Sequence, residues 1–163
     1  MPETVSVATI LRDEDVLLDS PVKSKSEILA AAADHLAPSS GVTRDVLLKA
    51  LAGREKLGST AINQGIAVPH AEIPGLAAPA AVVFRLARPI EFEAFDNTPV
   101  DLVFVLVWPS DKRSGLLATL GGLCRILRAE TLLQEIRRSS SRAEVRQLLQ
   151  DSTKPSKPRS DKA

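Results

Sequence analysis

Apolar side chains recur at helical spacing in two stretches of the first third of the chain. The first stretch follows a capping box at residues 24–27, in which a serine hydroxyl and a glutamate carboxylate satisfy free amides at a helix start. Pro38 and Gly41 are expected to end this helix. A second helix is predicted from about Thr43 to Lys56. Residues 1–23, with only short apolar patches, predict an irregular N-terminal segment.

Two runs with the composition of β-strands follow a region rich in helix breakers. Glycine, proline and asparagine are frequent over residues 57–79, which predicts a loop with short extended pieces. Residues 80–86 and 102–108 are rich in β-branched and aromatic side chains. The second run is apolar on both faces, as in a central strand that is covered on each side.

Helices are predicted again in the last third of the chain. A leucine-rich helix starts near Ser114, a short helix covers about residues 131–137, and a second capping box at residues 141–144 opens a last helix. Strands bracketed by helices predict a single α/β domain at residues 1–150, with a mixed central β-sheet flanked by helices on both faces. Residues 151–163 are polar and predict a disordered tail.

Composition excludes several classes of protein. The chain has 163 residues and a formal net charge of +1, so no overall basic field attracts nucleic acid. Four basic residues in the tail, offset by two acidic ones, are the only feature that suggests a nucleic-acid role. One cysteine and two histidines leave no set of ligands for a typical zinc site. We therefore expect no metal, no cofactor and no nucleic-acid partner.

The chain also lacks signals for a membrane or for export. Its longest apolar run, residues 100–109, is about half of the roughly 18 residues that a membrane helix needs. The N-terminus carries acidic residues where a signal peptide has basic ones. These features, with the single cysteine, predict a cytoplasmic protein without membrane insertion.

His70 lies in the most unusual segment of the sequence. It follows a proline, in a glycine-rich loop, behind a short apolar run. Pro69 fixes its own φ and biases Val68 toward extended geometry, so the backbone that presents His70 is stiff. Rigid placement suits a nucleophile or a proton carrier. The alternative is a histidine that ends a strand and only hydrogen-bonds its neighbours.

Two other reactive residue types have simpler interpretations. His35 borders the apolar face of the first helix, where a half-buried surface tolerates it. Cys124 lies in the leucine stripe of a later helix and is interpreted as a small buried hydrophobic residue.

Arg54 and Thr60 lie just before His70 in sequence. A basic residue at a helix C-terminus interacts favourably with the helix dipole, and Arg54 fits that structural role as well as the role of an anion clamp. Thr60 offers a hydroxyl and an amide in the loop, but no glycine-lysine-serine/threonine triplet makes this loop a nucleotide-binding motif. These residues alone leave both interpretations open.

Two longer segments resemble a known family. REKLGSTAINQGIAVPHAEIPGL and ARPIEFEAFDNTPVDLVFVLVWP, followed by the leucine-rich helix, resemble the fructose/mannitol-type IIA domain of the bacterial phosphotransferase system. Within that family the chain is most similar to the stand-alone nitrogen-regulatory IIA proteins. The resemblance extends over about residues 5–150.

The resemblance implies specific roles for three residues. His70 matches the family's phosphorylated histidine, which accepts a phosphoryl group through Nε2 from an HPr-like phosphocarrier protein. Arg54 matches an arginine that would clamp the phosphoryl oxygens, and Thr60 matches a threonine that would donate a hydroxyl nearby. Such transfer depends on in-line positioning and charge neutralisation, which suits a neutral imidazole beside an arginine.

The sequence departs from the family pattern in the loop and in the leucine-rich helix. Ala61 and Asn63 replace two glycines, and asparagine is expected to keep the turn because it tolerates positive φ. Leu116 occupies the position of a second histidine that would support the phosphoryl group. Leucine cannot do this, so phosphorylation is expected to be slower or to use Lys112 or Arg113 instead.

Two functions remain open at this point. The first is a regulatory IIA protein that carries phosphate on His70 and controls partner proteins according to its phosphorylation state. The second is a binding module that acts with little or no phosphorylation, as Leu116 would favour. Whether the chain is a working phosphotransferase component or a regulator alone is not decided by its residues, and neither are its regulated targets.

Overall fold

Side-chain caps open the helices where the sequence predicts them, in a computed structural model that describes residues 6–153. Ser24 Oγ accepts a hydrogen bond from the amide of Glu27 at 3.1 Å, and Ser141 Oγ accepts one from Glu144 at the same distance. The carboxylate of Glu27 reaches one residue beyond the cap and accepts from the amide of Lys23 at 2.7 Å. Local sequence therefore determines these helix starts.

Six α-helices lie within the described residues, and two of their ends differ from simple expectation. Pro38 does not end its helix; the helix continues to Ser40, and Gly41, at φ 77°, caps it. A proline this close to a C-terminus removes only one hydrogen bond, which the packing of the apolar face outweighs. The last helix passes Gln150 and ends at Thr153, and the rest of the predicted tail lies outside the described residues. The helices are α1 (Val7–Ile10), α2 (Lys25–Ser40), α3 (Arg44–Lys56), α4 (Arg113–Ile126), α5 (Glu130–Arg138) and α6 (Arg142–Thr153).

The strands form one mixed sheet of five strands, in the order β1-β4-β5-β2, with β3 also paired to β5. Strands β4 and β5 are antiparallel, and every other pair is parallel. The prediction that residues 16–20 are irregular was wrong, because they pair with β4 as an edge strand. The strands are β1 (Val16–Ser20), β2 (Ile66–Ala67), β3 (His70–Ile73), β4 (Ala80–Ile90) and β5 (Val100–Pro109).

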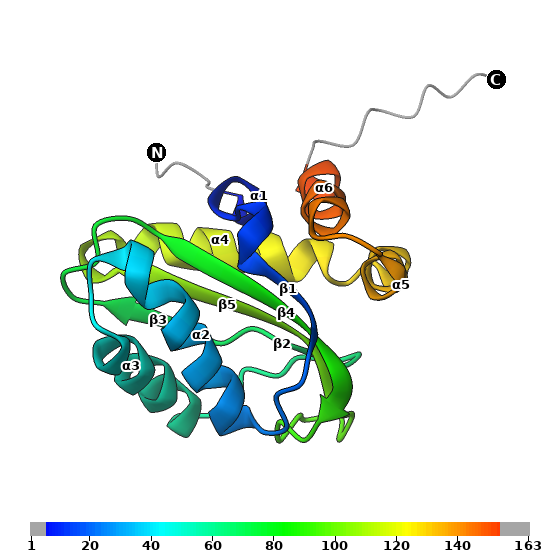
Figure 1. Ribbon diagram of the computed structural model, residues 1–163, viewed down its shortest axis with the longest axis horizontal. Coiled ribbons are helices and arrows are strands. Elements are labelled where there is room, and N and C mark those ends of the chain that lie inside the picture. Colours follow the sequence, from blue (N-terminus) through cyan, green and yellow to red (C-terminus); the bar gives the residue numbers. More distant parts are fainter. Residues whose placement is uncertain (1–5, 154–163) are drawn as a thin grey trace.

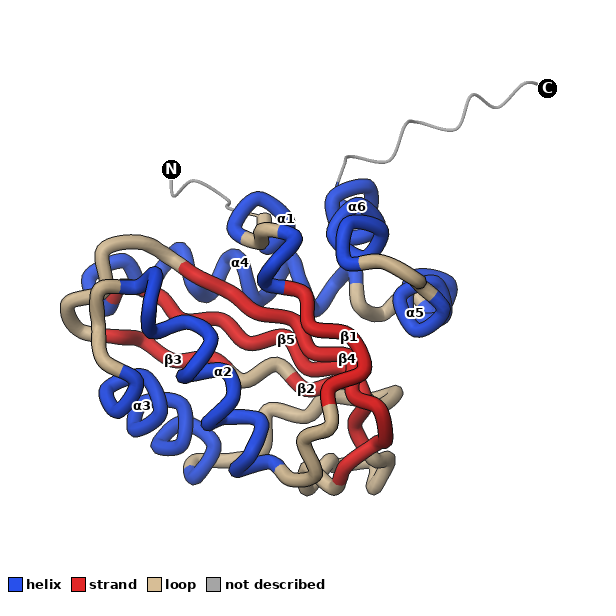
Figure 2. Tube along the Cα trace, in the orientation of Figure 1, coloured by secondary structure: helices blue, strands red, loops and turns tan. Residues whose placement is uncertain are grey.

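Helices cover both faces of the sheet, which confirms the predicted α/β architecture. Alternate residues of β5 enter two separate cores: Phe104 and Leu106 pack toward α1 and α4–α6, whereas Val103 and Val105 pack toward α2 and α3. Figure 1 shows α2 and α3 on one side of the sheet and the other four helices on the opposite side. The tube in Figure 2 shows the strands as the middle of three layers.

A buried carboxylate attaches the N-terminal segment to α2. Asp15 is 3% exposed and accepts hydrogen bonds from Arg12 Nε and Nη2, both at 3.2 Å. His35 Nε2 lies 2.8 Å from the Asp15 carboxylate, so His35 has a specific structural partner. Burial alone would raise the pKa of Asp15, but the hydrogen bonds from Arg12 and His35 outweigh burial and lower this pKa below its ordinary value of 3.8.

We expect Asp15→Asn to lower the free energy of unfolding by about 1–3 kcal/mol at pH 7, because it weakens buried charge-assisted hydrogen bonds. A lowered folded pKa means that the ionised carboxylate stabilises the fold above about pH 4 and that this contribution is lost as the pH falls through the folded pKa. Urea unfolding at pH 7 and pH 3 should therefore show a smaller difference between variant and parent at pH 3. Asp34→Asn, at an exposed carboxylate, is the control. An equal deficit at both pH values would contradict this account.

Candidate functional site

Pro69 divides the sheet edge into two short strands, and His70 begins the second one. Both β2 and β3 pair in parallel with β5, but Pro69 between them has no N–H to donate. Its carbonyl accepts a hydrogen bond from the amide of Leu106 at 3.0 Å, and His70 then lies in register with Leu106. The predicted stiffness of the backbone at His70 thus has two sources, the proline ring and the pairing with β5.

The imidazole of His70 is fixed in one tautomer. Its Nδ1 lies 2.8 Å from the carbonyl oxygen of Val68. Since a carbonyl oxygen only accepts, Nδ1 carries the proton, and Nε2 keeps a free lone pair. Ala71 and Ile73 point into the core beneath α2 and α3, so His70 points toward the opposite, α4 side of the strand.

The electrostatic surroundings of His70 favour its neutral form. Burial lowers the pKa of His70 below 6.5, and the positive charge of Arg54 lowers this pKa further. The hydrogen bond to Val68 and the carboxylates of Glu55 and Glu72 act in the opposite direction without cancelling the shift. At neutral pH the ring is therefore an uncharged nucleophile with Nε2 available.

A pocket of about 460 Å³ brings three of the predicted site residues together. Its lining residues come from the C-terminal part of α3 and the residue after it, from strand β3 and from the first turns of α4, and Figure 1 shows where these elements lie. Arg54 lies in the last turn of α3, and its Nη1 is 2.9 Å from the carbonyl oxygen of Gly58. Leu116 lines the same pocket as His70. The lining residues are Ala50, Arg54, Leu57, His70, Ala71, Glu72, Arg113, Leu116 and Leu117.

Of the two cations suggested as substitutes for a second histidine, Arg113 lines the pocket and Lys112 does not. Arg113 is the first residue of α4, and its Nε lies 3.1 Å from an oxygen of Glu72. Sequence reasoning missed Glu72. The sequence places Glu72 two residues after His70, and in a strand two such residues have their side chains on the same face of the sheet.

Thr60 does not line this pocket. Its side chain is buried, 6% of the residue being exposed, and its hydroxyl donates to a carboxylate oxygen of Glu55. The same carboxylate accepts from the amide of Thr60 at 3.3 Å and forms an ion pair with Lys25 Nζ at 3.0 Å. The predicted hydroxyl donor is thus engaged in a buried network that ties the loop to α3 and to the start of α2.

The turn in the loop before β2 has a different geometry from the one expected. Positive φ angles fall on Gln64, at 64°, and on Gly65, at 79°, and not on Asn63. The backbone at Gly65 packs closely, because a Cβ there would lie 3.0 Å from Arg137 Nη2. The suggestion that Asn63 keeps the turn by adopting positive φ was therefore wrong.

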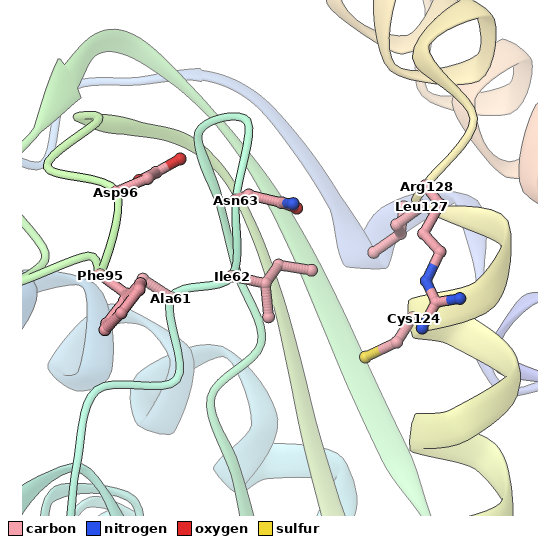
Figure 3. A pocket seen from close by; sticks show the side chains of 8 residues that line it. All are labelled: Ala61, Ile62, Asn63, Phe95, Asp96, Cys124, Leu127 and Arg128. Carbon is pink, nitrogen blue, oxygen red and sulfur yellow. The ribbon is translucent and has the colours of Figure 1, made fainter.

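A second pocket, of about 410 Å³, shares no lining residue with the first. Figure 3 shows Cys124 and Arg128 on the wall opposite Ile62 and Asn63. Cys124 is half-buried, and burial raises the pKa of its thiol, so the sulfur stays protonated at neutral pH. This pocket offers no nucleophile comparable to His70.

A family model matches residues 9–152, almost all of the described chain: the phosphoenolpyruvate-dependent sugar phosphotransferase system, EIIA 2. The chain belongs to this family. Among curated IIA relatives, a nitrogen regulatory protein of Bradyrhizobium diazoefficiens is 35% identical over 133 residues, covering 82% of this chain and 87% of the relative. The nitrogen regulatory protein of Escherichia coli K12 is 33% identical over 149 residues, or 91% of each chain.

Solved IIA structures share the fold. The nitrogen regulatory protein IIA-Ntr of Neisseria meningitidis superposes with a TM-score of 0.85 at 31% identity, covering 88% of this chain and 98% of that one. The mannitol IIA of Escherichia coli superposes with a TM-score of 0.73 at 22% identity, covering 85% and 98% of the two chains.

Residues 6–153 contain neither a membrane-spanning helix nor a cluster of metal-ligating side chains. No helix there is both long and apolar enough to cross a membrane. In the same range, no three side chains from histidine, cysteine, aspartate and glutamate come together in a way that could hold a metal ion.

We expect the pKa of His70 to be below 6.5 and its neutral ring to carry the proton on Nδ1, because burial and Arg54 disfavour the imidazolium and Val68 accepts from Nδ1. Ring-nitrogen NMR across pH 5–8 measures both, and His35→Gln assigns the signals, since the chain has two histidines. A pKa above 6.5, or a proton on Nε2 of the neutral ring, would show that the site does not prepare His70 as described.

Proposed function

We propose that this IIA protein is a regulatory phosphohistidine carrier: His70 accepts a phosphoryl group from an HPr-like phosphocarrier protein, and the phosphorylation state controls partner proteins. The observation that carries the proposal is the free Nε2 of His70, fixed by the bond from Nδ1 to Val68 in a pocket with Arg54. Family membership supports phosphoryl transfer, and relatives named nitrogen regulatory proteins, at 33–35% identity, support regulation.

The proposed transfer needs no proton to move between residues. The Nε2 lone pair of His70 attacks the phosphorus of the carrier's phosphohistidine, and the carrier's P–N bond breaks with its electron pair returning to the carrier's ring. His70 keeps its Nδ1 proton on the Val68 carbonyl and becomes a phosphoimidazolium. The carrier's ring leaves as neutral imidazole when its own second nitrogen is protonated. The two rings thus exchange roles symmetrically.

Arg54 neutralises charge on the phosphoryl oxygens in this proposal. It lines the pocket of His70, and the bond from Nη1 to the Gly58 carbonyl leaves other guanidinium donors free for a phosphoryl group. Thr60 has a supporting role: its buried bonds to Glu55 hold the loop that follows Arg54. Direct donation from Thr60 to the phosphoryl group would require its bond to Glu55 to break.

Exposed leucines beside His70 suit contact with protein partners. Leu57 is 85% exposed and Leu117 is 58% exposed, and both line the pocket. An apolar rim of this kind docks a partner and excludes water from the phosphoryl group. Phosphorylation would add about 1.5–2 negative charges at the centre of this rim, in a protein of net charge +1. A partner with an acidic contact surface would then bind the unphosphorylated state more tightly, and a partner with a basic contact surface would bind the phosphorylated state more tightly.

Leu116 favours a second function, a binding module that acts without phosphorylation. It is buried and apolar at the position where the resemblance predicts a second histidine. The same apolar rim would then bind the same partners whether or not His70 reacts. The two functions differ in whether partner binding depends on His70.

His70→Gln should abolish phosphorylation by an HPr-like carrier, because it removes the attacking nitrogen. Unfolding free energy should change by no more than about 1 kcal/mol, since His70 is only half-buried. Intact mass and acid lability of the added phosphate measure the reaction. His35→Gln is the matched control and should still be phosphorylated. An acid-labile phosphate that persists in His70→Gln would identify another acceptor.

Leu57→Ser and Leu117→Ser should each raise the KM for the phosphorylated carrier about threefold to tenfold and change kcat little, because they remove apolar contact area outside the reacting atoms. Val46→Ser, at another exposed apolar residue of α3 outside the pocket lining, is the control. Phosphotransfer kinetics with purified carrier measure the split. An unchanged KM in both pocket variants would exclude this rim as the carrier's docking surface.

A further inference from the structure

The pocket around His70 holds one carboxylate that the proposed reaction does not use. Its charged lining side chains are Arg54, Arg113 and Glu72. Glu72 would repel an arriving phosphoryl group, and it is paired with Arg113 at 3.1 Å. In a pocket proposed to bind a phosphoryl group, the charge of this carboxylate is thus offset by Arg113.

The fold aligns Arg113 with Glu72 through Trp108 and Gly115. Glu72 on β3 lies in register with Trp108 on β5. The backbone of Gly115 packs on the Trp108 ring so closely that a Cβ would lie 3.0 Å from Cζ2. Through this contact the first turn of α4 packs against the end of β5. Arg113, two residues earlier, consequently lies beside Glu72.

Strand geometry puts Glu72 near the reacting atom. His70 and Glu72 are two residues apart on one strand and point to the same side, about 7 Å apart along the backbone. An arginine paired with Glu72 can therefore turn toward Nε2 of His70 by rotating its own side chain, without movement of the backbone.

The pair is weak enough to exchange. The side chains of Arg113 and Glu72 are 71% and 37% exposed, and exposed ion pairs contribute little to stability. A phosphoryl group offers more negative charge and three acceptor oxygens, against two for a carboxylate. The guanidinium would therefore prefer the phosphoryl group once the latter is present.

We propose that Arg113 is a second ligand of the phosphoryl oxygens and that Glu72 holds it beside His70 until the phosphoryl group arrives. This inference rests on the proposed function. Arg113 changes only its ion-pair partner: it leaves Glu72, which turns to solvent, and joins Arg54 on the phosphoryl oxygens. No covalent bond to Arg113 forms or breaks.

Loading of His70 from phosphoramidate, a small phosphoryl donor, tests this without a protein carrier. Arg113→Gln should slow loading about tenfold, the effect of one charge-assisted hydrogen bond. Lys112→Gln removes the same charge one residue earlier, outside the pocket lining, and should load at the parent rate. Arg113→Lys keeps the charge but not the planar fork and should lie between them. Equal rates for Arg113→Gln and Lys112→Gln would overturn the inference.

The change of partner has a direct signal. In ¹⁵N NMR, the Nε–H resonance of Arg113 should shift with Glu72→Gln in the unphosphorylated protein and shift again when His70 is loaded. Arg44, an exposed arginine paired with Asp34 on the α2–α3 side, is the internal control and should not respond to loading. A resonance of Arg113 that is the same before and after loading would overturn the exchange.

The two proposals fail in different ways. If phosphoramidate loads His70 in an Arg113-dependent manner and an HPr-like carrier does not, the carrier function fails and the role of Arg113 stands. If the carrier phosphorylates the parent chain and Arg113→Gln equally fast, and phosphoramidate loads them equally fast, the role of Arg113 fails and the carrier function stands. If neither donor loads His70, both proposals are overturned.

Discussion

The hydrogen bond from His70 Nδ1 to the Val68 carbonyl determines what the site can do. It fixes the tautomer, leaves Nε2 with its lone pair and gives the ring proton a main-chain acceptor. The acceptor is a main-chain atom that lies directly before Pro69, whose own carbonyl is bound by Leu106 of the central strand. The orientation of the imidazole is therefore a property of the sheet and does not depend on a mobile side chain.

The charged side chains around the His70 ring form two groups, one buried and one exposed. Glu55, with its partners Lys25 and Thr60, is buried and cannot reorganise without cost. Arg54, Glu72 and Arg113 line the pocket, and the exposed pair of Glu72 and Arg113 is the one that we propose exchanges partners. The buried group holds the loop and the C-terminal part of α3 in place, and the exposed group is the one proposed to respond to a bound phosphoryl group. This division explains why a threonine close to His70 in sequence lies outside the pocket.

The sequence predicted most of the fold because its signals are local. Each signal spans only a short stretch of sequence, as in the capping serines, the two strand runs and the leucine-rich helix. Strand β1 was missed because it is short and irregular: its pairing with β4 shifts register after Leu17, and Asp19 has a φ of 55°. The pocket was predicted in part, since His70 and Arg54 carry a recognisable pattern. The pair of Glu72 and Arg113 joins residues far apart in sequence through the contact of Gly115 with Trp108, and no local pattern reports such a contact.

The loop before β2 has a further consequence, for solubility. A sheet edge offers unpaired N–H and C=O groups to any other extended chain, which is a common start of aggregation. On this side of the sheet, residues 60–62 of that loop already pair with the outer side of β2: the amide of Ile62 donates to the carbonyl of Ile66 at 2.8 Å, and the amide of Val68 donates to the carbonyl of Thr60 at 3.0 Å. Beyond Pro69 only the four-residue strand β3 follows. No continuous template longer than four residues is exposed there. The loop that leads to the imidazole thus protects part of this edge from fibril-like pairing with another molecule.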